Sequence, residues 1–138
     1  MKRLTSYTSL LAIFIGVLVL IGWTFHVSFL KEPIPGIISM KFNTAVCFVL
    51  SGIVLYVIQT KGYTKQSQIL VYSASLIILI VSLIVILEYI LQSNFGIDEL
   101  LWKEGPGTTA TIYPGRMSLV TALDFILLGF IFIGLKFK

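Results

Sequence analysis

Four long apolar runs restrict this chain to a narrow set of folds. They cover approximately residues 9–29, 40–58, 69–91 and 117–135. Each run is close to the ~20 residues that an α-helix needs to cross about 30 Å of hydrocarbon. Because backbone groups in lipid must bond within their own segment, and because the runs do not alternate, we expect helices and not strands. The predicted fold class is an all-α transmembrane four-helix bundle, in a single domain of residues 1–138.

The composition favours a membrane protein and argues against several kinds of site. Apolar residues make up 57% of the chain and charged residues 12%, against roughly 25% charged in a soluble domain. Cys47 is the sole cysteine, which excludes an intramolecular disulfide and a CxxC motif. His26 is the sole histidine, and no nucleophile–base arrangement or phosphate loop is visible. We therefore expect no catalytic residue, no metal and no cofactor.

The distribution of charge predicts the orientation. The net charge of +4 comes from Lys and Arg near the ends of the runs, which is typical of membrane topology and not of a nucleic-acid surface. Six Lys or Arg fall on the side of the two termini and four on the other. The positive-inside rule puts both termini in the cytoplasm, with the lipid bilayer of a bacterial inner membrane as first partner. Lys2 and Arg3 resemble the start of a signal peptide, but no cleavage site closes the first run, so we expect it to be retained.

A repeated motif divides the chain into two halves. From Met40 to Gly52 and again from Met117 to Gly129 the sequence reads M-x-x-x-T-A-x-x-F-x-L-x-G. Two spans separate the copies, so both enter the membrane from the same side, and we predict parallel two-helix repeats over about 9–58 and 69–135. The shared residues fall on one helix face, and the small ones allow close approach. The predicted helix-packing residues, where the second and fourth spans meet, are Thr44, Ala45, Phe48, Gly52, Thr121, Ala122, Phe125 and Gly129.

The connection between the third and fourth spans has a pattern of its own. Apolar and charged residues interleave between Ile97 and Lys103, which predicts a short helix lying in the membrane interface. Trp102 in this segment and Trp23 at the end of the first span are expected to be interfacial anchors.

Two carboxylates occur inside apolar runs, where an ionisable group costs a few kcal/mol of free energy. Glu88 lies roughly 6 Å below the end of the third span, and Asp124 lies roughly 10 Å into the fourth. Ionisable groups at such depths usually face a protein interior or a wet cavity. We therefore predict that both line one polar pocket that opens to the periplasm. In the alternative interpretation Glu88 extends to the interface, Asp124 bonds to a neighbouring helix, and no ligand is involved.

Several polar residues at the same level are candidates to complete this sensing pocket. They are Lys41, Arg116, His26, Asn43 and Tyr89. Arg116 is about 12 Å from Asp124 along one helix, so Lys41 is the expected ion-pair partner of Asp124.

Two phrases carry a resemblance to a known family. G-I-D-E-L-L-W-K-E (Gly96–Glu104) precedes P-G-R-M-S-x-x-T-A-L-x-F-x-L-L-G (Pro114–Gly129), and an earlier P-G-I-I-S-M-K-x-N-T-A-x-x-F-x-L-x-G covers Pro35–Gly52. Together they are similar to the N-terminal membrane sensor region (MASE-like) of bacterial sensor histidine kinases and diguanylate cyclases. The resemblance implies a homodimeric sensory module that detects a periplasmic or membrane-borne stimulus. It also implies cytoplasmic signalling domains in cis, so we expect an excised input domain or a stand-alone relative.

Two other functions fit the sequence less well. A small proton-coupled transporter would use Glu88 and Asp124 as a titrating pair, but parallel repeats and the lack of a carboxylate in the first two spans argue against it. A structural subunit would bind a partner membrane protein through the faces that carry Gly52 and Gly129.

Overall fold

The computed structural model describes residues 2–32, 39–60, 64–99 and 113–135, and these residues contain helices and no strand. The predicted all-α class is therefore confirmed. The helices, in chain order, are α1 (Lys2–Thr24), α2 (Ser28–Lys31), α3 (Phe42–Thr60), α4 (Lys65–Leu91) and α5 (Leu119–Gly134).

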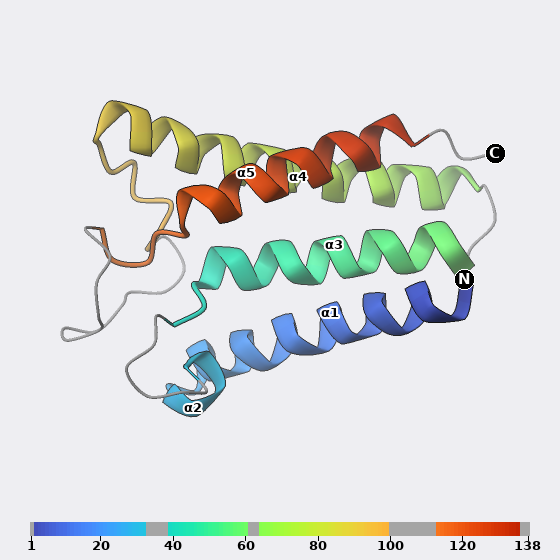
Figure 1. The fold of residues 1–138 in the computed structure, drawn as a ribbon, viewed down its shortest axis with the longest axis horizontal. Coiled ribbons are helices and arrows are strands. Elements are labelled where there is room, and N and C mark those ends of the chain that lie inside the picture. Colours follow the sequence, from blue (N-terminus) through green and yellow to red (C-terminus); the bar gives the residue numbers. More distant parts are fainter. Residues whose placement is uncertain (1, 33–38, 61–63, 100–112, 136–138) are drawn as a thin grey trace.

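The four longer helices lie side by side and form two antiparallel hairpins, α1 with α3 and α4 with α5 (Figure 1). α1 begins and α5 ends at the same end of the molecule. α3 is central, because it packs on α1, on α4 and, over a smaller area, on α5. Within the described elements α1 packs on α2 and α3 but on neither α4 nor α5.

Among the described residues, three helices are long and apolar enough to cross a membrane, namely α1 from Thr5, α3 and α4. α5 is apolar but has 16 residues, about 24 Å of helix, which is less than the hydrocarbon thickness. It starts later than the predicted fourth span because Ser118 is its N-cap and accepts a 3.1 Å hydrogen bond from the Thr121 amide.

Two other predicted boundaries differ from the structure. The first helix ends at Thr24, because His26 takes a left-handed φ of 57°, and the unpredicted helix α2 follows. Of the predicted interfacial helix, Ile97 to Glu99 are not helical, and the rest, with Trp102, lies outside the described residues.

The two hairpins are closed by the same kind of hydrogen bond. The indole Nε1 of Trp23, near the end of α1, donates to the carbonyl of Met40 at 2.9 Å. The hydroxyl of Tyr89, near the end of α4, donates to the carbonyl of Met117 at 3.0 Å. Met40 and Met117 are the first residues of the two motif copies. Trp23 is buried, with 3% of its surface exposed. Its role as an interfacial anchor stays a prediction.

The two motif glycines let the helices of each hairpin approach closely. A Cβ on Gly52 would lie 2.7 Å from the Ile13 side chain and 2.8 Å from the Ser9 carbonyl of α1. A Cβ on Gly129 would lie 2.6 Å from the side chain of Leu79 in α4. Both motif glycines therefore face a helix of their own hairpin.

The motif phenylalanines form one of the contacts between the hairpins, in addition to the packing of α3 on α4. The rings of Phe48 and Phe125 meet edge to face, with centroids 5.7 Å apart and planes at 87°. Thr44, Ala45, Ala122 and Phe125 are buried, while Thr121 is half-buried and its hydroxyl is hydrogen-bonded to that of Ser118. The second and fourth predicted helices thus touch, although each packs more extensively on its own hairpin partner.

Candidate functional site

A buried cluster of three charged side chains lies at the end of α4 and the start of α5. The Nε of Arg116 donates to Oδ2 of Asp98 at 2.7 Å, and its Nη2 lies 3.4 Å from Oε2 of Glu88. All three side chains are almost inaccessible, with residue exposures of 1% for Arg116, 2% for Asp98 and 0% for Glu88. Guanidinium and carboxylate groups that lie so close in a buried environment interact strongly, but removing them from water costs free energy.

The backbone around residue 115 brings Arg116 and Asp98 together. Gly115 has φ of +74°, in the left-handed region that favours glycine. A Cβ at this position would lie 2.5 Å from the carbonyl oxygen of Asp98. The close approach of these two segments therefore depends on a residue without a side chain.

Glu88 holds the turn that follows α4. Gln92 ends the helix with a left-handed φ of 48°, and the chain then folds back over the last turn. The amide of Phe95 donates to Oε1 of Glu88 at 2.7 Å, and the carbonyl of Ser93 accepts from Nη2 of Arg116 at 2.8 Å. Each of the two charged groups thus replaces hydrogen bonds that this turn would otherwise make with water.

Two tyrosines and one asparagine complete the surroundings. The guanidinium carbon of Arg116 lies 4.0 Å from the ring centroid of Tyr113 and 5.4 Å from that of Tyr89, within the range of cation–π attraction. The Tyr113 hydroxyl donates to the Gln92 carbonyl at 3.0 Å. Asn43, at the start of α3, donates from Nδ2 to the carbonyl of Ile97 at 3.4 Å. The turn after α4 therefore contacts α3, α4 and the segment before α5.

The cluster has more capacity for hydrogen bonds than its described neighbours satisfy. Oε2 of Glu88, Oδ1 of Asp98 and Nη1 of Arg116 are buried without a hydrogen-bond partner among the described residues. Two carboxylates face one guanidinium, so the ionised cluster carries a net negative charge. Such a group has an energetic reason to accept a proton, a water molecule or a small polar ligand. Within the described part of the chain, no three His, Cys, Asp or Glu side chains are placed to hold a metal ion.

The first hairpin has a different construction at the matching place. When Trp23 is matched to Tyr89 through their hydrogen bonds, the preceding residues Gly22 and Glu88 become counterparts. A Cβ on Gly22 would lie 2.7 Å from Leu30 of α2, so α2 packs where the second hairpin has its carboxylate. The amine of Lys31 lies 4.4 Å from the Trp23 ring centroid, as the Arg116 guanidinium lies over Tyr89. The buried carboxylate is therefore specific to the second half.

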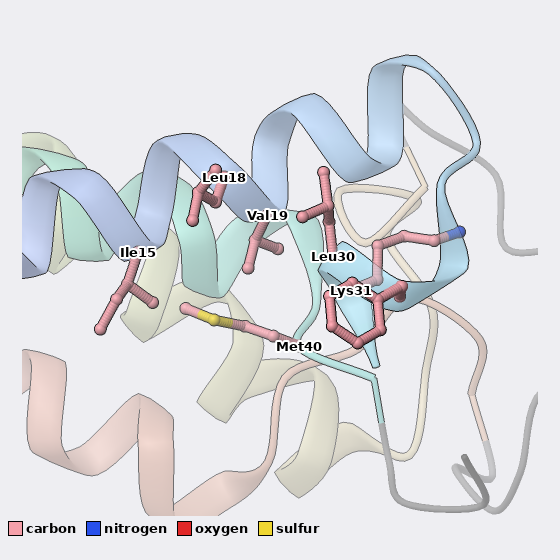
Figure 2. A pocket seen from close by; sticks show the side chains of 7 residues that line it. Ile15, Leu18, Val19, Leu30, Lys31 and Met40 are labelled. Atoms are coloured by element: carbon pink, nitrogen blue, oxygen red, sulfur yellow. The ribbon is translucent and has the colours of Figure 1, made fainter. Parts of the chain in front are cut away.

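A hollow beside α2 is chemically unlike the charged cluster. It has a volume of about 380 Å³ and is lined by Ile15, Leu18, Val19, Phe29, Leu30, Lys31 and Met40. Lys31 lies at one end, with its amine pointing away from the other labelled side chains (Figure 2). Apolar walls of this kind suit hydrocarbon and offer nothing to orient a polar ligand.

The structure does not bring the two predicted pocket carboxylates together. Asp124 is exposed on α5 and forms no ion pair with a described residue, whereas Glu88 is fully buried. The helical period explains this, because Ala122 and Phe125 share the inward face of α5 and Asp124, between them in the sequence, falls on another face. The predicted pair of Asp124 with Lys41 is absent from the described residues, because Lys41 is buried before α3.

The other predicted site residues divide in the same way. Arg116, Asn43 and Tyr89 lie in or beside the cluster, while His26 is exposed in the turn after α1. The sequence predicts that the loop from Gln92 to Tyr113 borders the pocket, but it does not single out Asp98 as a site residue. A cation buried ahead of an apolar helix needs an acid, but the loop offers three, Asp98, Glu99 and Glu104, and no spacing rule selects one.

Comparisons of the chain with protein-family models, with curated proteins and with solved structures found no match.

Proposed function

We propose that this chain is the transmembrane sensory input module of a bacterial signalling protein. It would detect a periplasmic or membrane-borne stimulus and relay it to cytoplasmic output domains. The observation that supports this proposal is the buried cluster of Glu88, Asp98 and Arg116, in which three polar atoms lack a hydrogen bond from the described residues. A chemical change in this cluster has direct routes into two long helices, because Glu88 is in the last turn of α4 and Arg116 lies just before Ser118, the N-cap of α5.

We also propose that α5 crosses the bilayer as a fourth span and that the chain consists of two parallel two-helix repeats. The bonds from Trp23 to Met40 and from Tyr89 to Met117 support the repeat. The packing of α5 along α4 supports a fourth span, since α4 has the length and hydropathy of a transmembrane helix. Both termini would then be cytoplasmic in an inner membrane, as the charge distribution predicts.

The stimulus must stabilise two arrangements of the helices unequally if it is to produce a signal. Addition of a proton or a small polar ligand to the cluster changes its net charge and the number of bonds available to Arg116. The turn at residues 92–98 would then rebond, because the Ser93 carbonyl and the Phe95 amide are bonded to the side chains of Arg116 and Glu88. α4 and α5 would shift relative to each other in response.

The test is to place residues 1–138 ahead of a diguanylate cyclase or histidine kinase reporter and to measure its output in membranes. Glu88→Gln and Asp98→Asn remove charge with little change of shape, and Ser73→Ala, at an exposed position of α4, is the matched control. We expect both cluster variants to change basal output and to lose the response to any condition that modulates the parent. If output and response stay at the parental level in both variants, the cluster is not the sensing site.

The transporter alternative loses its main support, because Asp124 does not share a pocket with Glu88. If the chain were a proton-coupled transporter, proteoliposomes that contain it would show proton flux.

A further inference from the structure

One face of α5 is exposed although its counterpart in the first half is buried. Val120, Asp124, Leu127 and Ile131 recur every three or four residues and form a stripe along α5, hereafter the α5 stripe. Exposure is 68% at Val120, 62% at Leu127 and 55% at Ile131, and Asp124 is also exposed.

Alignment of the two motif copies maps this stripe onto α3. Its counterparts are Asn43, Cys47, Leu50 and Val54. Cys47 and Val54 are completely buried, and with Leu50 they belong to the core that α3 shares with α4 and α5. In the first half of the chain this face is therefore covered by another helix, α4. In this structure α1, the counterpart of α4, does not reach α5.

Asp124 makes the uncovered stripe costly. It lies about 8 Å along the helix from the start of α5. Asp124 forms no ion pair with a described residue, and α5 packs against α4, a helix able to span the membrane. The inference rests on the proposal that α5 is a fourth span, in which case this side chain faces lipid. A carboxylate in such a place costs a few kcal/mol and normally pairs with a donor.

We propose that the α5 stripe is the docking surface for a transmembrane helix of another protein that carries a cation or an amide donor at the depth of Asp124. Charge complementarity favours this occupant over a second copy of the chain. A symmetric pairing of two stripes would bring Asp124 against its own copy, and like charges repel in a low dielectric.

The four cations whose side chains the structure describes do not lie on an exposed face of a long helix interior. Lys41 and Arg116 are buried, whereas Lys31 and Lys65 lie at helix ends, in the last turn of α2 and at the first residue of α4. A partner helix that supplies this donor would cover the α5 stripe, just as α4 covers the corresponding face of α3.

The experiment uses the full chain in phosphatidylcholine bilayers with a synthetic Leu/Ala helix of about 24 residues as probe. One probe carries a single Lys about 8 Å below one interface, and its control has Leu there. Association is measured by Förster transfer between labelled chain and labelled probe. We expect the Lys probe to bind roughly tenfold more tightly than the Leu probe.

Three variants locate the effect. Asp124→Leu should abolish the preference for Lys, and Asp124→Asn should retain only part of it, while Leu123→Ala, a neighbouring exposed position, should leave it unchanged. Because all these side chains are exposed, the variants should keep the helical circular dichroism of the parent. Equal binding of the two probes, or a Lys preference that persists in Asp124→Leu, would overturn the proposal. Transfer between copies of the chain that Asp124→Leu abolishes would instead identify a second copy as the occupant and would equally overturn it.

Discussion

Phe48 and Phe125, which come from different hairpins, meet edge to face with ring centroids 5.7 Å apart. They occupy the same position in the two motif copies, so one of the contacts between the hairpins joins a residue to its own counterpart. An axis between these rings would exchange α3 with α5, and α1 with α4. The two halves differ at α2, at Glu88 and at the exposed α5 stripe, and our proposals concern the last two.

Removal of the buried cation should be the most damaging change at the cluster. Arg116→Met would leave Glu88 and Asp98 buried without their counter-charge, and we expect a loss of about 3–5 kcal/mol in the free energy of unfolding. Denaturant unfolding in detergent micelles, followed by circular dichroism, measures this value. The triple variant that adds Glu88→Gln and Asp98→Asn should recover part of the loss, because no unpaired charge then remains. A single-variant loss below about 1 kcal/mol would contradict a tight, dry cluster.

Two glycines with positive φ allow the free-energy cost of backbone strain to be measured apart from that of a steric clash. Gly115 and Gly96 have φ of 74° and 80°, but a Cβ on Gly96 would meet nothing within 4 Å. Gly96→Ala should therefore cost about 1 kcal/mol from strain alone. Gly115→Ala should cost at least about 1 kcal/mol more, because its Cβ would press on the Asp98 carbonyl. Equal unfolding energies for the two variants would show that residues 98 and 115 are not in close contact.

The motif glycines should also differ from each other. A Cβ on Gly52 meets the backbone oxygen of Ser9, whereas on Gly129 the nearest atoms belong to the flexible side chain of Leu79. Gly52→Ala should therefore destabilise by roughly 1–3 kcal/mol, and Gly129→Ala by less, since Leu79 can change rotamer. Thermal unfolding in one detergent compares them, with Gly134→Ala, where nothing lies within 4 Å, as the control. A larger loss for Gly129→Ala would contradict the packing described.

The hydrogen bonds that Trp23 and Tyr89 donate to backbone carbonyls allow the two hairpins to be compared. Tyr89→Phe removes only the hydroxyl that donates to Met117, and we expect a loss of about 1 kcal/mol. Trp23→Phe removes the bond to Met40 and also buried ring area, so its cost should be larger, roughly 2–3 kcal/mol. Denaturant midpoints at constant slope measure both. If Tyr89→Phe proves neutral, its hydroxyl is equally well satisfied by water, and the equivalence of the two bonds has no energetic meaning.

The helical class and most of the helix limits were predictable, because they depend on local properties. Continuous apolar runs near Met40, Ile69 and Met117 are long enough for helices whatever their neighbours are. The correspondence of the two motifs is equally evident from the sequence, and it predicts Phe48 and Phe125 as packing residues. The end of the first helix was less predictable, since the left-handed turn at His26 and the short helix α2 follow from no strong local signal.

Tertiary structure alone decided which polar residues meet. Asp98 and Arg116 face each other across a turn whose path depends on Gly115, and no periodicity relates them. Asp124 and Glu88 look alike in sequence, as acids within apolar runs, but one is exposed and the other fully buried. Sequence by itself determined that this chain forms apolar helices in two related halves, because length and hydropathy act locally. Burial depends on which helix covers which face, and that is a property of the whole packed molecule.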